Sequence, residues 1–593
     1  MTAASSPQLT VPMADPSAPA RTDTDLASIQ EARQLSRRAR VAQQALAELS
    51  QEHIDALVDA MAAAVRPHAE ALARMAVDET GFGVVEDKIQ KNVFAAERVH
   101  AFIRPMKTVG VIRRLEDKRI VEIAEPFGVV AAIVPSTNPT STAIYKILIA
   151  IKARCAIVLS PHPSAAGCIS RTCEIMATAA RQAGAPADII GWMTSVTLEG
   201  TQELMRQREV AVILATGGMG LVRSAYSAGK PAYGVGPGNA PAFIERTADV
   251  PKAVADIIRG KTFDNGVLCS SENSVVVDAP VAASVREAFV KQGGYFLAPR
   301  EAEAVAKVLV TPQRLPNPTL VGRSAATVAE KAGITVPPGT RVLLAELAGV
   351  GRDHPLSIEK LCPVLSYYVV RDWQEGCERC KEILRYGGMG HTMSIHSTNE
   401  DVILQFGLHK PAFRIVVNTP TTLGSIGLTT GLDPAMTLGC GGFGGNITSD
   451  NISPLHLLNV KRLAYEVRPV SSSSPHDAKP KAAAPPRQLD ADTLRQRIDA
   501  FLTMRGYAPP APPPAGGDTR SGPAEPVSAA SPPTSPPSSQ VSSSPGAPEA
   551  FVCEDDVRRA VRDGRQLLVG ARTIVTPAAR DVASSHPVFV HVD

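Results

Sequence analysis

Between residue 110 and about residue 465, short apolar runs rich in β-branched residues alternate with longer stretches whose apolar residues recur every three or four positions. The short runs are typical of β-strands and the longer stretches of α-helices. Strands that alternate with helices favour parallel sheets covered by helices. The sequence therefore predicts an α/β fold, preceded by a helical segment from residue 25 to about residue 103.

The composition changes on both sides of this body. Residues 1–24 are rich in Pro, Ser and Ala, and we expect them to be disordered. Residues 470–488 and 507–550 have the composition of linkers, and the second is a Pro/Ser-rich tract with too few apolar residues to fold. We expect a short helix over residues 489–506 and a small compact element over residues 551–593, so most of the C-terminal tail is predicted to be disordered.

The overall charge argues against one class of partner. Lys plus Arg number 61 and Asp plus Glu number 58, so the net charge of +3 gives no electrostatic footprint for nucleic acid. The longest apolar stretches are interrupted by Lys and Arg before they reach the ~20 residues of a membrane span. The N-terminus lacks the charged and apolar regions of a secretory signal. We expect neither nucleic acid nor a membrane as a partner.

The nine cysteines are few for 593 residues, and their odd number and spacing do not indicate a disulfide framework. This usage is typical of a reducing, cytoplasmic compartment. Cys377 and Cys380 form a C-x-x-C, but no second pair lies nearby to complete a zinc site. Because the surrounding residues have helical periodicity, we expect both cysteines on one helix face and no metal.

Cys269 stands where a turn leads into a strand, in FDNGVLCSSENSVVVD (263–278). Gly266 permits a sharp turn, and the SVVV that follows predicts a buried strand. Small neighbours leave room for a substrate and bring a backbone N–H close to the sulfur. Taken alone, a buried structural cysteine is the commoner interpretation of such a residue, and a nucleophile is the second.

Asn138 follows an apolar run in IVPSTNPTSTAIYK (133–146). A loop at the C-terminal end of a strand is where α/β proteins bind ligands. An asparagine amide there can donate a hydrogen bond to a developing oxyanion. On local evidence alone, a turn-forming Asn before Pro is the commoner interpretation.

Two glycine-rich loops have the composition that lets a backbone approach a cofactor closely. They are ATGGMGLVRSA (215–225) and GVGPGN (234–239), and neither is a G-x-G-x-x-G. An ordinary glycine turn is an equally good interpretation of each. Taken singly, Glu359 in EKLCPV is typical of a surface carboxylate, and His391 in GGMGHT of a structural histidine.

Together and in this order, these segments resemble the aldehyde dehydrogenase superfamily. The resemblance covers about residues 25–465 and is close to the CoA-acylating branch, which forms the N-terminal half of bifunctional aldehyde/alcohol dehydrogenases. Each segment is weak evidence alone, but their occurrence together in this order is specific. The segments are PSTNPTS, SPHP (160–163), GWM (191–193), ILATGGMGLV (213–222), GKPAYGVGPGN (229–239), KTFDNGVLCSSE (261–272), EKLCPV, GGMGHT, TLGCGGFGGN (437–446) and HLLNVKRLAYE (456–466).

The resemblance implies an aldehyde dehydrogenase fold. A Rossmann-like cofactor domain is expected over residues 25–240, completed by about 430–465, and an α/β catalytic domain over 241–429. Cys269 matches the nucleophile, Asn138 the oxyanion donor, and His391 is a candidate base. The residues that match the cofactor site are Ser160, His162, Thr216, Gly217, Gly218, Gly234, Gly236, Gly238 and Glu359.

The implied reaction is oxidation of a short aldehyde to an acyl-CoA through a thioester on Cys269. The expected cofactor is NAD, with NADP as the alternative, and coenzyme A is the co-substrate. Hydrolytic relatives carry a glutamate in the loop matched by residues 233–239, and this loop has no carboxylate. Two alternatives stay open: a hydrolytic, non-acylating aldehyde dehydrogenase, and an inactive scaffold in a microcompartment.

By its position in the family, the small, hydroxyl-rich stretch 421–434 is expected to line the aldehyde pocket. It favours acetaldehyde or propionaldehyde, and sulfoacetaldehyde is the alternative. The resemblance also implies a homo-oligomer, either a dimer or a tetramer.

The helix expected over residues 489–506 carries one apolar stripe, formed by Leu494, Ile498, Phe501 and Leu502. An isolated helix of this length is marginal in water and is expected to fold when it docks on a partner. It resembles the encapsulation peptides of enzymes packed into bacterial microcompartments, which implies shell proteins as partners and residence inside such a compartment. The alternative is that it folds back onto its own body or supports oligomer contacts.

Overall fold

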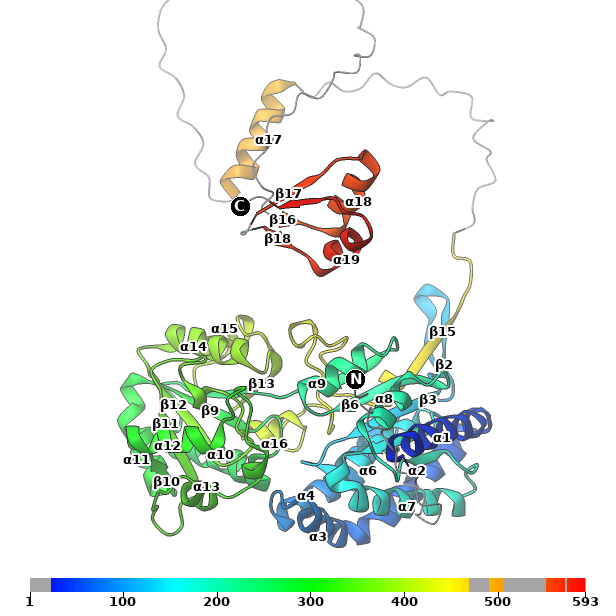
Figure 1. Ribbon diagram of the computed structural model, residues 1–593, viewed down its shortest axis with the longest axis horizontal. Coiled ribbons are helices and arrows are strands. Elements are labelled where there is room, and N and C mark those ends of the chain that lie inside the picture. The colour runs from blue at the N-terminus through cyan, green and yellow to red at the C-terminus, as the bar shows by residue number, and fades with distance from the viewer. Residues whose placement is uncertain (1–22, 469–489, 505–550, 571–572, 592–593) are drawn as a thin grey trace, which may run out of the picture. The chain divides into compact units, whose positions relative to one another are not determined.

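The chain forms two compact units, Met1–Ser472 and Ser473–Asp593. Each unit is described by itself. The computed structural model describes residues 23–468, 490–504, 551–570 and 573–591. Within the first unit the predicted α/β fold is confirmed, because two parallel sheets are covered by helices (Figure 1). None of the helices in the described residues is long and apolar enough to cross a membrane.

The first sheet has five parallel strands in the order β5-β4-β3-β6-β7. Alternate residues of β3 enter two separate cores, since Val130 packs in the core that contains α6 and α7, and Ala131 in the core that contains α1 and α8. A strand covered on both faces must be apolar at every position, which explains its continuous apolar run. The elements are β3 (Val129–Val134), α6 (Pro139–Lys152), β4 (Ile157–Pro161), α7 (Ala166–Gln182), β5 (Ile190–Trp192), α8 (Leu198–Arg206), β6 (Val210–Thr216), α9 (Met219–Tyr226) and β7 (Ala232–Val235).

The second sheet has seven parallel strands in the order β10-β11-β12-β9-β8-β13-β14. Its helices also cover both faces. Cys377 and Cys380 are both buried on α14 against this sheet, as the helical periodicity predicted. The elements are β8 (Ala240–Ile244), α10 (Val250–Thr262), β9 (Glu272–Asp278), α11 (Ala282–Lys291), β10 (Gly294–Phe296), α12 (Pro299–Leu309), α13 (Ala325–Lys331), β11 (Val342–Glu346), β12 (Val364–Val370), α14 (Trp373–Tyr386), β13 (Gly390–His396), α15 (Glu400–Leu408), β14 (Ala412–Val417) and α16 (Thr421–Ser425).

The helical N-terminal segment is confirmed, with one correction to its start. The helix α1 begins at Thr24, inside the segment expected to be disordered, because the carboxylate of Asp23 accepts hydrogen bonds from two backbone N–H groups of its first turn. Residues 1–22 lie outside the described part of the chain. The helices are α1 (Thr24–Ala47), α2 (Gln51–Val65), α3 (Ala69–Thr80), α4 (Val85–Val93) and α5 (His100–Ile103).

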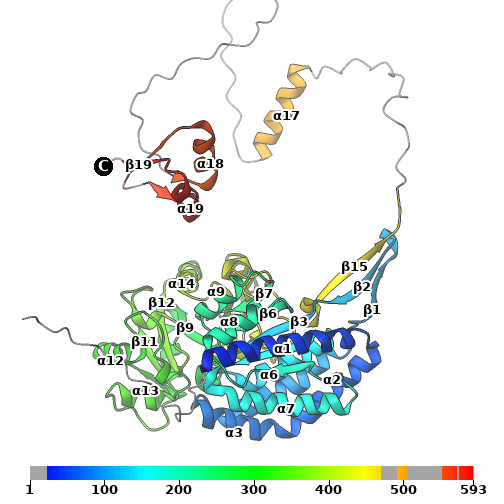
Figure 2. The ribbon, with the colours of Figure 1, turned by 45° about the vertical axis from the view of Figure 1, so that its right-hand side comes forward.

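A third sheet differs from the expected pattern because it is antiparallel. It joins β1 (Gly110–Leu115), β2 (Ile120–Pro126) and β15 (Leu458–Ala464), and it projects from the body as an arm (Figure 2). The turn between β1 and β2 is tight, and Arg119 adopts a φ of 51° within it. The third strand comes from the far end of the body, so local periodicity could not reveal this sheet.

The second unit contains the two elements expected in the tail. The helix α17 (Ala491–Met504) falls within the expected residues 489–506, and the exposed side chains of Leu494 and Ile498 lie on its apolar stripe. The C-terminal element pairs β16 with β18 and β17 with β19. The expected linkers, 470–488 and 507–550, lie outside the described residues. The elements are β16 (Phe551–Val552), α18 (Glu554–Asp563), β17 (Leu567–Val569), β18 (Ile574–Val575), α19 (Pro577–Ser585) and β19 (Phe589–His591).

Candidate active site

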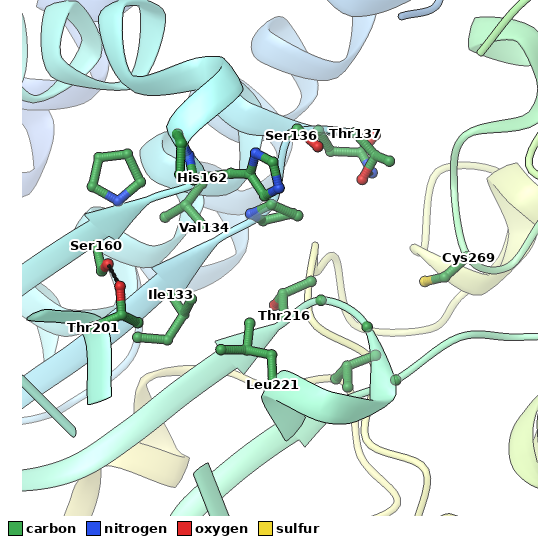
Figure 3. Close-up of a pocket in the computed structure, with 18 of the residues that line it drawn as sticks. Ile133, Val134, Ser136, Thr137, Ser160, His162, Thr201, Thr216, Leu221 and Cys269 are labelled. Atoms are coloured by element: carbon green, nitrogen blue, oxygen red, sulfur yellow. Dashed lines mark hydrogen bonds between the residues drawn. The ribbon is translucent and has the colours of Figure 1, made fainter. Parts of the chain in front are cut away.

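A cavity of about 480 Å³ lies where the C-terminal ends of β3, β4 and β6 face the segment that carries Cys269 (Figure 3). Ligands bind at this edge of parallel sheets because the loops that follow the strands meet there. Most of the predicted site residues line the cavity: Asn138, Ser160, His162, Thr216, Gly217, Gly218, Gly236, Cys269 and Glu359. Gly234, Gly238 and His391 do not line it.

Cys269 is placed by a turn of unusual conformation. Asp264, Asn265 and Gly266 all adopt positive φ, at 50°, 53° and 72°. A Cβ on Gly266 would lie 2.9 Å from the carbonyl oxygen of Lys261, so this position requires glycine. Cys269 follows this turn at the entrance to β9, the buried strand that the sequence predicted. It is partly exposed to the cavity, unlike seven of the nine cysteines, which are buried.

The environment of the Cys269 thiol favours its protonated form. Burial raises the pKa of the thiol to about 12, and the nearby Glu359 carboxyl adds to the shift. The Arg414 guanidinium and the backbone N–H of Cys269 act in the opposite direction, but they do not offset the burial. A nucleophilic Cys269 therefore needs a proton acceptor within the site.

Asn138 has its side-chain oxygen engaged and its amide nitrogen available. Its Oδ1 accepts a hydrogen bond from Lys91 Nζ at 2.5 Å, and its Nδ2 donates to Thr137 Oγ1 at 3.2 Å. The side chain makes no capping hydrogen bond to α6, although Asn138 directly precedes that helix. The turn-forming interpretation therefore does not account for this side chain. Its remaining Nδ2–H can donate a hydrogen bond to a substrate oxygen.

Three buried charged residues that the sequence analysis missed lie behind Asn138. Lys88 and Lys91, both on α4, pair with the carboxylate of Asp264. Lys88 Nζ also donates to the carbonyl oxygen of Thr137 at 3.0 Å. The lysines are three positions apart on one helix face, which is the available sequence signal, but nothing local indicates that this face is buried.

The ends of β4 and β6 bring to the cavity groups that suit a dinucleotide (Figure 3). Gly217 and Gly218 lead from β6 into α9, so a helix N-terminus faces the cavity, where backbone N–H groups can bind phosphate. The buried Thr216 Oγ1 has no hydrogen-bond partner within the described residues, so it is available to a ligand. Ser160 Oγ pairs with Thr201 Oγ1 at 2.8 Å (Figure 3). These features fit a nicotinamide dinucleotide.

Glu359 is buried, at 9% exposure, so its interpretation as a surface carboxylate is wrong. Its Oε1 accepts a hydrogen bond from the backbone N–H of Gly238 at 2.9 Å. Burial raises the pKa of Glu359 to about 8, and the Gly238 hydrogen bond counteracts part of that shift. The carboxyl can therefore exchange a proton near neutral pH.

The two glycines outside the cavity have structural reasons to be glycine. A Cβ on Gly238 would lie 2.1 Å from the carbonyl oxygen of Cys269, so this glycine allows the loop to pack against the candidate nucleophile. Gly234 lies within β7, where a Cβ would lie 2.8 Å from Val222 Cγ1. The cofactor contact expected of both glycines stays a prediction.

His391 is buried behind Gly238 and is ill suited to the base role expected for it. Its Nδ1 pairs with Thr392 Oγ1 at 3.0 Å, and its Nε2 has no partner among the described residues. Burial, and then the Arg414 charge, lower the pKa of His391 to about 3. An imidazole with so low a pKa is a poor proton acceptor near neutral pH.

Residues 421–434 are not among the residues that line this cavity. Their place in the aldehyde pocket stays a prediction. Their hydroxyl groups bond inside the protein: Thr421 Oγ1 donates to Ser394 Oγ at 2.8 Å, and Thr422 Oγ1 to the Gly260 carbonyl at 2.8 Å. Ser425 Oγ donates to Ser270 Oγ at 2.7 Å. The stretch supports the segment around Cys269 rather than presenting these hydroxyls to a substrate.

The chain resembles known proteins over most of its first unit. A family model described as the aldehyde dehydrogenase family matches residues 6–294. The bifunctional aldehyde-alcohol dehydrogenase AdhE of Escherichia coli K12 is 42% identical over 442 residues, which are 74% of this chain and 50% of that protein. The chain therefore spans about half the length of such bifunctional relatives.

Two solved structures extend this comparison. An acetylating aldehyde dehydrogenase from Geobacillus thermoglucosidasius is 50% identical, with a TM-score of 0.75 over 76% of this chain and 99% of that one. A propionaldehyde dehydrogenase from Rhodopseudomonas palustris, solved with bound CoA and an acylated cysteine, is 26% identical, with a TM-score of 0.65 over 74% of this chain and 97% of that one.

The environment of Cys269 predicts how its reactivity depends on pH. Because the thiol pKa is raised to about 12, its alkylation by iodoacetamide should keep rising about tenfold per pH unit past the ordinary thiol value of 9.0. The rate is measured by mass spectrometry of the peptide that contains Cys269, with the Cys269→Ala variant as the control. An alkylation rate that levels off below pH 9.0 would contradict the raised pKa.

Proposed function

The chain belongs to the aldehyde dehydrogenase family, and from that premise we propose that it is a CoA-acylating aldehyde dehydrogenase. It oxidises a short aldehyde and passes the acyl group from Cys269 to coenzyme A. The observation that carries this proposal is the shared cavity of Cys269 and Asn138, whose neighbouring loop, residues 233–239, supplies no carboxylate to activate water. The acetylating relative from Geobacillus supports it as well.

The reaction begins when the Cys269 thiolate attacks the aldehyde carbon. The Asn138 amide donates a hydrogen bond to the oxygen as it becomes an oxyanion. Loss of hydride from the tetrahedral carbon leaves a thioester on Cys269. When bound, the nicotinamide cofactor supplies the hydride acceptor. The thiolate of coenzyme A then attacks the thioester carbonyl, and the bond to Cys269 breaks so that Cys269 leaves as a thiolate. The acyl group is thereby transferred, and one thioester replaces another.

Glu359 is our candidate for the group that receives the Cys269 proton. It is the one carboxyl among the residues that line the cavity, and it lies close enough to Cys269 to raise the pKa of the thiol. Its own pKa of about 8 matches a proton acceptor that works near neutral pH.

The cofactor would be held where the ends of β4 and β6 line the cavity. The N-terminus of α9 and the residues Gly217 and Gly218 would bind its phosphates, and Thr216 Oγ1 is free to accept or donate a hydrogen bond. The residues that line the cavity include neither Lys nor Arg. NADP sites use such a cation for the 2′-phosphate, so this lining favours NAD, with NADP as the alternative.

The lining of the cavity also bears on the aldehyde. Val267 and Leu361 are the lining residues that flank Cys269 and Glu359 in sequence, and both are apolar. Without a lining Lys or Arg, the cavity has no cation for a sulfonate. A short, uncharged aldehyde such as acetaldehyde or propionaldehyde is therefore favoured over sulfoacetaldehyde.

The two alternatives are weaker on the same evidence. A hydrolytic enzyme needs a base for water, and residues 233–239, the loop that carries this base in hydrolytic relatives, have no carboxylate here. An inactive scaffold has no need of a partly exposed cysteine that shares a cavity with an oriented amide.

For the tail, we infer that α17 is an encapsulation peptide that docks on microcompartment shell proteins. Leu494 and Ile498, on its apolar stripe, are about half exposed, at 50% and 49%. For the body, we infer a homo-oligomer, a dimer or a tetramer. The projecting arm exposes Val111 and Leu463, which oligomer formation would cover.

Removing coenzyme A tests the proposed function directly. With aldehyde and NAD alone, reduced cofactor should stop at about one equivalent per site, because the thioester has no acceptor. Absorbance in a rapid-mixing instrument measures this burst, and the Cys269→Ala variant should show none. Sustained production of free acid without coenzyme A would instead identify a hydrolytic enzyme.

The Asn138→Ala variant should lower kcat by about a hundredfold, the usual effect of losing one oxyanion donor. Asn399→Ala is a suitable control, because Asn399 caps α15 and lies outside the cavity. Steady-state kinetics with both variants measures the difference. An unchanged kcat in Asn138→Ala would return this residue to a purely structural role.

Deleting residues 470–593 should leave the aldehyde dehydrogenase activity intact but abolish co-purification with shell proteins. The full-length Leu494→Asp variant should behave in the same way, because it interrupts the apolar stripe without shortening the chain. Activity and pull-down assays on the same preparations make this comparison. If activity is lost, or the oligomer changes on size-exclusion chromatography, the tail belongs to the enzyme itself.

A further inference from the structure

Two ammonium groups share one carboxylate in the buried cluster of Lys88, Lys91 and Asp264. The three side chains are at most 2% exposed, and Asp264 is the ion-pair partner of both lysines among the described residues. Burying a charge that its partners neutralise only in part is costly. Such a charge persists where neighbouring dipoles are oriented to stabilise it. Here the receiving groups are the side-chain oxygen of Asn138 and the carbonyl oxygen of Thr137.

The cluster joins three segments that are distant in sequence. Lys88 and Lys91 come from α4, Asn138 from the loop after β3, and Asp264 from the left-handed turn just before Cys269. The Asp264 carboxylate also accepts the N–H of Val84 at 2.7 Å. The position of Asn138 is thereby fixed relative to the segment that carries Cys269.

The contact between Lys91 and Asn138 also has an electronic consequence. An ammonium that donates to an amide oxygen draws electron density from the amide, which makes its N–H groups stronger donors. It also prevents the amide from turning its oxygen toward the cavity. An oxyanion would be repelled by that oxygen, so one amide orientation supports the reaction and the other opposes it.

We propose that Lys91, held by Asp264, is a positioning residue that orients and polarises the Asn138 amide for the oxyanion. The inference rests on the proposed function and deepens it, since it assigns a role to a residue outside the cavity lining. Lys91 acts through Asn138 and has no need to touch the substrate.

Lys152 provides a matched control for the burial of an ion-paired lysine. It is fully buried, pairs with Asp55 and donates to the carbonyl oxygen of Arg104 at 2.9 Å. It lies at the C-terminal end of α6, while Asn138 precedes the N-terminal end, so about 20 Å of helix separates them. Loss of this lysine should affect stability in a similar way without affecting Asn138.

The test is a double-mutant cycle read on the first turnover. The rate of the reduced-cofactor burst is measured for Lys91→Met, Asn138→Ala, the double variant and Lys152→Met. Lys91→Met should slow the burst about tenfold or more with an unchanged KM for NAD, and Lys152→Met should leave it within about twofold. The double variant should be no slower than Asn138→Ala, because Lys91 acts only through that amide.

Two results would overturn the inference. One is a double variant in which the losses of burst rate in Lys91→Met and Asn138→Ala multiply. The other is a Lys152→Met variant that loses as much burst rate as Lys91→Met. If Lys91→Met does not fold, Lys91→Gln replaces it, since a neutral amide still donates to Asn138. It should then retain more of the burst rate than Asn138→Ala, and a rate as low as that of Asn138→Ala would contradict the inference. The burst precedes acyl transfer, so the cycle stays informative even if the product proves to be free acid.

Discussion

The C-terminal ends of parallel strands lie at one edge of a sheet, and this constraint determines where the chemistry of the molecule can occur. Strands β3, β4 and β6 deliver Asn138, Ser160 and Thr216 to the same cavity. Cys269 reaches the cavity from the other sheet, through a turn in which three successive residues have positive φ. The buried pairing of Asp264 in that turn with Lys88 and Lys91 then fixes the two halves of the site against each other.

Burial sets the protonation states of the groups around the cavity. It raises the pKa of Cys269 to about 12 and that of Glu359 to about 8, while it lowers that of Lys91 to about 8. In each case the neutral form is favoured relative to water. The thiol stays protonated until an acceptor takes its proton. Glu359 therefore matters to the proposed reaction as that acceptor, and not only as a contact to the cofactor.

Much of this arrangement was predictable from the sequence because strands, helices and glycine-rich turns have local signatures. The strand β9, the loop at Asn138 and the α/β order follow from short-range patterns. The antiparallel arm, the cluster at Lys91 and the internal bonding of residues 421–434 each depend on at least one partner more than a hundred positions away. His391 shows the same limit, since the glycine motif beside it gives no indication of the burial that lowers its pKa.

The central claim is that Cys269 carries the acyl group between oxidation and transfer to coenzyme A. The most direct test is mass spectrometry of the protein after it reacts with an aldehyde and NAD, followed by addition of coenzyme A. The account predicts an acyl adduct on the peptide that contains Cys269, and its loss as acyl-CoA forms. An adduct on another cysteine, or acyl-CoA formed with Cys269 never modified, would contradict it.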